Sequence, residues 1–210
     1  MGDSVYVYGI VEAESFELDV DGVEASSPIY TVTHGPLAAV VSDLASTDVE
    51  RTDENVRAHD AVLREVLTGD GGRTVVPMQF GMAFASNRAL VNVLRGARPS
   101  FRKALRAVDG SVELGVKVVT ENGAAIDGDE VRGIADETFE SVSIDSVAND
   151  RFSDRLILNR SYLVDRDEQD AFGAAVETFE RQVDGVIVQY TGPWAPYNFV
   201  DIAVGTDRHP

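Results

Sequence analysis

The sequence predicts an α+β fold divided into two domains, one over residues 1–109 and one over residues 110–210. Short apolar runs rich in β-branched residues alternate with stretches in which apolar residues recur at helical spacing, so strands and helices are interspersed. The pattern is interrupted at Asp109-Gly110 and then starts again with a strand. A chain of 210 residues is long enough for two small domains, each with its own core.

The first half predicts three strands, a helix, a short strand and two more helices, over residues 5–10, 29–33, 37–44, 53–67, 74–76, 87–94 and 99–108. His34-Gly35-Pro36 is a suitable turn for a hairpin between the second and third strands. Thr52 or Asp53 can cap the first helix. The last helix carries Phe101, Ala104, Leu105 and Val108 on one face, which favours a buried amphipathic helix.

The second half predicts a βαβαβ pattern and a tail. The strands are expected over residues 112–118, 156–164 and 185–190, and the helices over residues 131–142 and 165–183. Asp165 and Glu168 have the spacing of a capping box at the start of the second of these helices. Residues 199–204 fit either a last strand or a short helix.

The composition indicates an acidic intracellular protein. The formal net charge is −18, which disfavours nucleic acid as a partner because phosphate contacts need positive charge. Only Lys103 and Lys117 are lysines, against sixteen arginines, and this balance is typical of a halophilic protein. An ordinary acidic mesophilic protein is the alternative. We expect no membrane insertion, because no apolar run approaches the roughly 20 residues that a spanning helix needs.

The usual catalytic and cofactor motifs are missing from the sequence. The chain has no cysteine, so thiolate catalysis and zinc–thiolate sites are excluded. His59 is followed by Asp60, which allows a general base oriented by a carboxylate, but a lone histidine on a helix is more often a partly buried structural residue. The acidic run Asp127-Gly128-Asp129-Glu130 lacks the spacing of a calcium loop and favours a solvated helix start. We therefore expect no catalytic residue, cofactor or metal.

Basic residues concentrate in one stretch of this acidic chain. Residues 88–117 carry seven basic and only two acidic side chains. The candidate partner-binding residues in this stretch are Arg95, Arg98, Arg102, Lys103 and Arg106. They predict a docking face for an acidic partner, because arginine pairs with carboxylates in a bidentate geometry. Intramolecular ion pairs with the acidic second half are the alternative.

The segment Thr191-Gly192-Pro193-Trp194-Ala195-Pro196-Tyr197-Asn198-Phe199 holds the only tryptophan of the chain and two of its seven prolines. Each proline fixes its own φ and biases the preceding residue toward extended geometry. The segment is therefore either a rigid turn that closes a core or a surface that presents aromatic side chains to a partner.

Several segments follow one another in the order of a known family. They are residues 5–10, His59-Asp60, Val76-Pro77-Met78-Gln79-Phe80-Gly81, Val112-Glu113-Leu114-Gly115-Val116-Lys117, Ser161-Tyr162-Leu163-Val164 and the segment over residues 191–199. Together they resemble the gas vesicle accessory proteins of the F/L family, and the compact length is more similar to the F member. Gln79 departs from the family pattern, in which arginine is more usual at this position.

The resemblance implies a mixed α+β N-terminal domain, a ferredoxin-like C-terminal domain and a role without catalysis. It implies a cytoplasmic protein, associated with gas vesicles, that acts in their assembly by binding the hydrophobic major shell protein and other accessory proteins. It also implies that Gly192, Pro193, Trp194, Pro196, Tyr197 and Phe199 are structural signature residues, with Trp194 buried against the C-terminal sheet. A small-ligand-binding protein or an enzyme that uses a cleft between the domains is the alternative.

Overall fold

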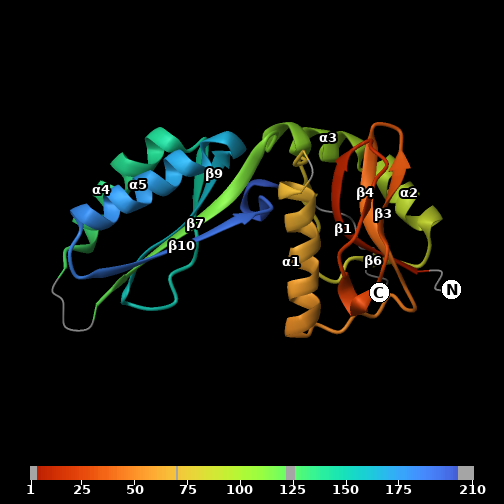
Figure 1. Ribbon diagram of the computed structural model, residues 1–210, viewed down its shortest axis with the longest axis horizontal. Coiled ribbons are helices and arrows are strands. Elements are labelled where there is room, and N and C mark those ends of the chain that lie inside the picture. The colour runs from red at the N-terminus through yellow and green to blue at the C-terminus, as the bar shows by residue number, and fades with distance from the viewer. Residues whose placement is uncertain (1–3, 70, 122–125, 203–210) are drawn as a thin grey trace. The chain divides into compact units, whose positions relative to one another are not determined.

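The computed structural model describes residues 4–69, 71–121 and 126–202. The chain forms two compact units (Figure 1). Unit 1 contains the residues up to Asp109 together with the segment from Ala195 onward, and unit 2 is Gly110–Trp194. The predicted α+β fold class is confirmed, because antiparallel sheets and α-helices are present in both units.

Unit 1 is built on a six-stranded antiparallel sheet. Its strands are β1 (Ser4–Glu12), β2 (Glu17–Leu18), β3 (Ile29–His34), β4 (Leu37–Leu44), β5 (Val76–Pro77) and β6 (Ala83–Phe84). The order is β2-β3-β4-β1-β5, and β6 also pairs with β1. The predicted hairpin forms between β3 and β4, with His34 paired to Leu37.

The described residues of unit 1 also form three α-helices: α1 (Asp53–Thr68), α2 (Asn87–Gly96) and α3 (Arg98–Ala107). The hydroxyl of Thr52 accepts a hydrogen bond from the Asn55 amide, so Thr52 is the residue that caps α1. The apolar face expected for α3 is buried, and its Phe101 lies in the core with β1 and β4 residues such as Val7 and Val41.

Unit 2 has the order β7 (Ser111–Thr120), α4 (Gly128–Phe139), β8 (Asp145–Ala148), β9 (Leu156–Asp165), α5 (Gln169–Gln182) and β10 (Val186–Trp194). Its four-stranded antiparallel sheet runs β10-β7-β9-β8. This βαββαβ connection with the fourth strand beside the first is the ferredoxin-like arrangement that was expected. The predicted βαβαβ pattern missed β8, because four residues with the sequence Asp-Ser-Val-Ala carry no periodic apolar signal.

The helices α4 and α5 cover one face of this sheet (Figure 1). Four aromatic rings form the centre of the core between the helices and the sheet. Phe139 stacks with Phe172 at 5.3 Å between ring centroids and lies 5.2 Å from Tyr162 and 5.4 Å from Phe179. The helical spacing that the sequence showed for Phe172 and Phe179 therefore reflects burial of one helix face.

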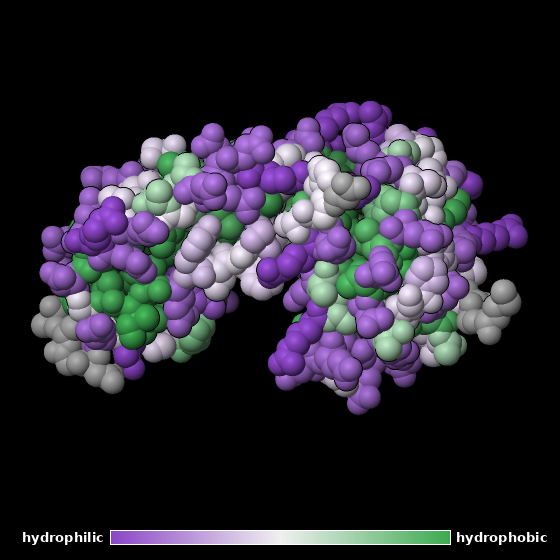
Figure 2. All heavy atoms as spheres, in the orientation of Figure 1, coloured by the Kyte–Doolittle hydropathy of each residue, from purple (hydrophilic) through white to green (hydrophobic). Residues whose placement is uncertain are grey.

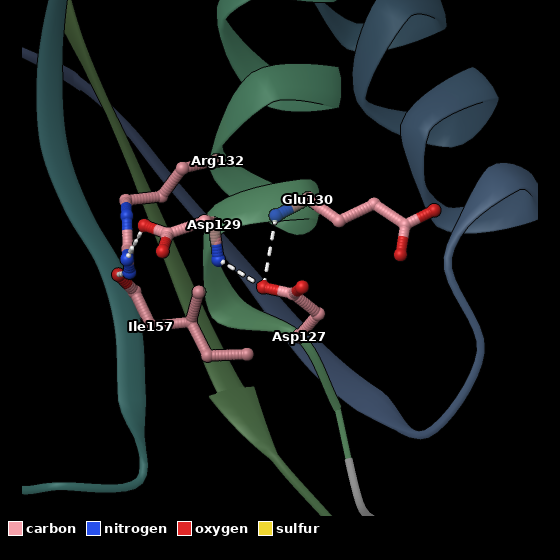
Figure 3. A network of polar contacts seen from close by, with 5 residues as sticks. All are labelled: Asp127, Asp129, Glu130, Arg132 and Ile157. Carbon is pink, nitrogen blue, oxygen red and sulfur yellow. Dashed lines mark hydrogen bonds and ion pairs between the residues drawn. The ribbon is translucent and has the colours of Figure 1, made fainter.

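The acidic run at the start of α4 is a helix cap (Figure 3). The carboxylate of Asp127 accepts hydrogen bonds from the backbone amides of Asp129 at 2.9 Å and Glu130 at 3.3 Å. Arg132 reaches back to the Asp129 carboxylate and to the carbonyl of Ile157 on β9. The Asp127 carboxylate thus satisfies free amides at the positive end of the helix, as expected for a solvated helix start.

The capping box predicted for α5 is wrong. Asp165 accepts a hydrogen bond from the Asp167 amide and starts a 3₁₀ turn over Arg166–Glu168, after which α5 begins at Gln169. The chain turns more tightly than an α-helix directly after β9, so Glu168 precedes the helix instead of lying in its first turn.

The tail lies with unit 1, although we expected it to belong to the C-terminal domain. Its only regular element among the described residues is a 3₁₀ turn over Tyr197–Phe199, and Val200 and Ile202 pack on the unit 1 core. The strand or helix expected over residues 199–204 is absent from its described part, and residues 203 and 204 lie outside the described residues. No described helix combines the length and apolar character needed to cross a membrane.

Candidate functional site

A basic surface lies on α2 and α3 of unit 1. We use this name for Arg95, Arg102, Lys103 and Arg106, whose side chains are all exposed. They project from α2 and α3, whose other faces bury Leu94 and Phe101. The described residues form three ion pairs, between Arg73 and Glu14, Arg132 and Asp129, and Arg160 and Asp136. None of these three ion pairs uses a residue of the basic surface.

Arg98 differs from the other predicted partner-binding residues. It is only half exposed, and its Nη2 lies 3.3 Å from His34 Nε2 at the β3–β4 turn. Gly35 of the same turn lies against the guanidinium, and the buried Nε has no hydrogen-bond partner among the described residues. Arg98 lies in the first turn of α3, where its guanidinium contacts the β3–β4 turn.

A groove of about 350 Å³ lies beside the basic surface. Its lining comes from α3 and from the tail, and consists of Ser100, Lys103, Ala104, Ala107, Phe199, Val200 and Asp201. Phe199 and Val200 are partly exposed there. The arrangement places apolar surface next to exposed cations, which suits a partner segment that carries both carboxylates and an apolar side chain.

His59 lies in a buried aromatic cluster and is only 1% exposed. Its ring centroid is 5.6 Å from that of Tyr6, 5.5 Å from Tyr8 and 5.9 Å from Phe80. Burial lowers the pKa of His59 to about 4, so the ring is neutral at neutral pH. The ring nitrogens bond to tyrosine hydroxyls and not to Asp60, so the arrangement of a histidine base oriented by Asp60 does not form.

The donor and the acceptor of each hydrogen bond around His59 can be assigned. The Tyr197 hydroxyl donates to the carbonyl oxygen of Met78 at a long 3.4 Å, so its oxygen accepts from His59 Nε2–H at 2.8 Å. His59 Nδ1 is then the acceptor for the Tyr6 hydroxyl, also at 2.8 Å, and the Tyr6 oxygen accepts from the Gly81 amide at 3.0 Å. Tyr197 comes from the tail, so this network ties the tail to α1 and β1.

Replacing Tyr197 with phenylalanine should lower the free energy of unfolding by about 1–3 kcal/mol, because it removes the tyrosine oxygen that accepts from the buried His59 Nε2–H at 2.8 Å. Chemical denaturation in multimolar KCl measures this loss. Tyr190→Phe removes a hydroxyl from a side chain that is 42% exposed and is the matched control, with an expected change below about 0.5 kcal/mol. Equal losses in the two variants would contradict a structural role of the network.

Comparison with known proteins shows the family. A family model described as "Gas vesicle synthesis protein GvpL/GvpF" matches residues 4–130 and 127–201. The chain is 52% identical to gas vesicle protein F of Haloferax mediterranei over 209 residues, covering 99% of this chain and 98% of that protein. It is 49% identical to gas vesicle protein F1 of Halobacterium salinarum, again over 99% and 98% of the two chains. The chain belongs to the GvpL/GvpF family.

Solved structures agree with this assignment at the level of the fold. The crystal structure of GvpF from Anabaena sp. superimposes with a TM-score of 0.84 at 16% identity and covers 96% of this chain and 100% of that one. GvpF from Microcystis aeruginosa gives a TM-score of 0.83, also at 16% identity, over 95% and 100% of the two chains. The family model and the haloarchaeal F relatives confirm the resemblance inferred from the ordered motifs and its greater similarity to the F member.

The signature segment of this GvpL/GvpF chain divides between the two units. Trp194 ends β10 in unit 2, whereas Ala195 and Pro196 are buried and Tyr197 reaches His59 in unit 1. The expectation that Trp194 is buried against the sheet is wrong, because its side chain is 36% exposed. Trp194 pairs with Glu113, whose neighbours Val112 and Leu114 fill the helix-covered face, so Trp194 lies on the face without helices.

Gly192 explains the bend before Trp194. Its φ is +123°, in a region that favours glycine, and the β10–β7 register shifts between Thr191 and Trp194. A Cβ at this position would lie 2.9 Å from the Glu113 carbonyl oxygen. The glycine therefore lets β10 approach β7 closely just before the chain leaves unit 2. The spacing of Gly and Pro in the sequence indicated a rigid segment but not its division between units.

Proposed function

We propose that this protein acts without catalysis as an accessory protein of gas vesicle assembly, and that it binds the major shell protein and other accessory proteins. Membership of the GvpL/GvpF family over nearly the whole chain supports a role in gas vesicle synthesis. The observation that carries a binding role is the basic surface, which presents exposed cations without ion-pair partners among the described residues of a chain with a net charge of −18.

The basic surface and the adjoining groove suit one kind of contact. An acidic partner segment can pair its carboxylates with Arg102 and Arg106 while an apolar side chain enters the groove beside Phe199. Arginine suits this role because its planar guanidinium binds a carboxylate through two parallel hydrogen bonds and is weakly hydrated. In multimolar salt such short-range contacts persist better than long-range attraction, since the Debye length falls to about 3 Å at 1 M.

Co-purification tests the proposed function directly. The tagged full-length chain, expressed with the other gas vesicle proteins and isolated in multimolar KCl, is expected to retain the major shell protein and at least one other accessory protein. A parallel preparation with an unrelated acidic halophilic protein carrying the same tag controls for nonspecific retention. Recovery of neither the shell protein nor any other accessory protein above that control would contradict the proposal.

A further inference from the structure

We propose that β10, the edge strand of unit 2, is a docking site at which an extended segment of a partner protein adds to the sheet as a further strand. The proposal rests on the geometry of unit 2 alone and does not depend on the basic surface. The partner segment that this edge fits carries apolar side chains at alternate positions and basic residues at its ends.

Among the described residues, the backbone of β10 from Val186 to Thr191 pairs on one side only. In the order β10-β7-β9-β8 its one neighbour there is β7. Edge strands present a row of backbone amide and carbonyl groups to any extended chain, and natural proteins usually protect them with charged residues, proline or short length. The sequence Val-Ile-Val-Gln-Tyr-Thr-Gly-Pro-Trp contains no charged residue, although 26% of the chain is charged, and its one proline lies near its end.

The side chains of β10 are unusually apolar for their exposure. Five large hydrophobic side chains are exposed among the described residues, and three of them belong to this strand: Ile187 at 48%, Tyr190 at 42% and Trp194 at 36%. Figure 2 shows apolar surface on unit 2 near the start of β10. A patch of this kind on an otherwise charged protein marks a contact surface.

The exposed side chains lie on both faces of the strand. The Tyr190 ring lies 6.0 Å from that of Phe172 on α5, so Tyr190 is on the helix-covered face. Ile187 is three residues away and therefore points to the other face. A strand paired with β10 would cover apolar surface on both sides of the sheet at once, in addition to satisfying backbone groups.

The opposite edge of the same sheet provides a comparison within the molecule. It is formed by β8, which has four residues and begins with Asp145. A short strand with a charge is the usual protection of an edge, whereas β10 has nine residues and no charge. The two edge strands of this sheet therefore differ in length and in charge, and only β10 lacks the features that oppose strand addition.

The net charge of unit 2 favours a separate partner over a second copy of this chain. Residues 110–194 contain 18 acidic and seven basic residues. Burial raises the pKa of Tyr190, and the nearby carboxylate of Asp170 raises it further. Asp170 therefore adds a negative charge near the strand. Pairing of two β10 strands would bring two such acidic units together, whereas a segment with basic ends gains attraction. Screening in high salt weakens both the repulsion between two acidic units and the attraction of a basic segment, but it does not reverse the preference for the basic segment.

A synthetic peptide, Arg-Val-Thr-Val-Thr-Val-Arg, tests the proposal with the full-length protein in multimolar KCl. Trp194 is the only tryptophan and ends β10, so its fluorescence reports binding directly. We expect a saturable blue shift. Ile187→Lys should raise the dissociation constant at least about tenfold, because charge on an edge strand opposes strand addition. Ile144→Lys changes a side chain that is 61% exposed outside β10 and should leave binding unchanged.

Three results would overturn the proposal. In the first, a peptide N-methylated at the backbone amides of both its edges binds as tightly as the unmodified peptide. This would show that the contact uses side chains alone and not strand pairing. Equal binding of a peptide with glutamate at both ends would exclude the preference for a basic segment. Reversible dimerisation of the protein alone, abolished by Ile187→Lys, would assign a second copy to the edge. Circular dichroism confirms beforehand that both lysine variants are folded.

Discussion

Combined charge reversal at Arg102, Lys103 and Arg106 is expected to weaken binding of the acidic partner by about tenfold to a hundredfold, because like charges placed across an interface cost several kcal/mol. The same triple variant should change the free energy of unfolding by little more than about 0.5 kcal/mol per site, the usual range for exposed positions. Retention of the partner in co-purification measures the loss of binding, and thermal unfolding measures the change in stability. Both experiments are done in multimolar KCl.

Glutamate substitutions at Arg57, Arg151 and Arg181 form the matched control. These side chains are exposed, and their reversal changes the net charge by the same amount as the test variant. We expect this control to keep the partner. If both triple variants lose it equally, net charge and not the basic surface governs binding. A collapse of the melting temperature in the test variant would instead favour an intramolecular role for these cations.

His59 should make the protein lose stability as the pH falls from above 6.5 toward 4. The unfolded chain takes up a proton on this histidine near pH 6.5, whereas burial lowers the folded pKa to about 4. Between these values the unfolded state binds more protons, so the free energy of unfolding falls with falling pH. The full loss is about 3 kcal/mol at roughly 1.4 kcal/mol per pH unit.

The hydrogen-bond network gives this loss a structural cause. A protonated His59 donates from both nitrogens, so the Tyr6 oxygen would receive hydrogens from His59 and from the Gly81 amide. The Tyr6 hydroxyl hydrogen would then have lost its acceptor, in a buried site where an unsatisfied donor is costly.

Urea denaturation at fixed high salt measures the free energy of unfolding between pH 6.5 and 4. Comparison of His59→Gln with the unchanged protein isolates the contribution of His59 to its pH dependence. The many carboxylates of the chain also titrate as the pH falls, but they are common to both proteins. The variant should be less stable at neutral pH and show a shallower slope between pH 6.5 and 4. Parallel curves would contradict the assignment of the acid sensitivity to His59.

The sequence by itself determined most of the longer helices and strands and the family. The alternation of apolar and polar residues predicted most strands and helices, since burial of one face imposes a period of two or 3.6 residues. The ordered motifs identified the GvpL/GvpF family because they extend over nearly the whole chain. The short strand β8 escaped prediction for the same physical reason, as four residues are too few to show a period.

Only the tertiary structure decided where side chains from distant segments meet. Tyr197 bonds to His59 across 138 residues of sequence, and no local pattern encodes that contact. Arg98 and Arg102 lie four residues apart on α3, yet the β3–β4 turn covers the first and leaves the second exposed. The edge position of β10 depends on the strand order of its sheet, which is set by long-range pairing and not by the strand's own residues.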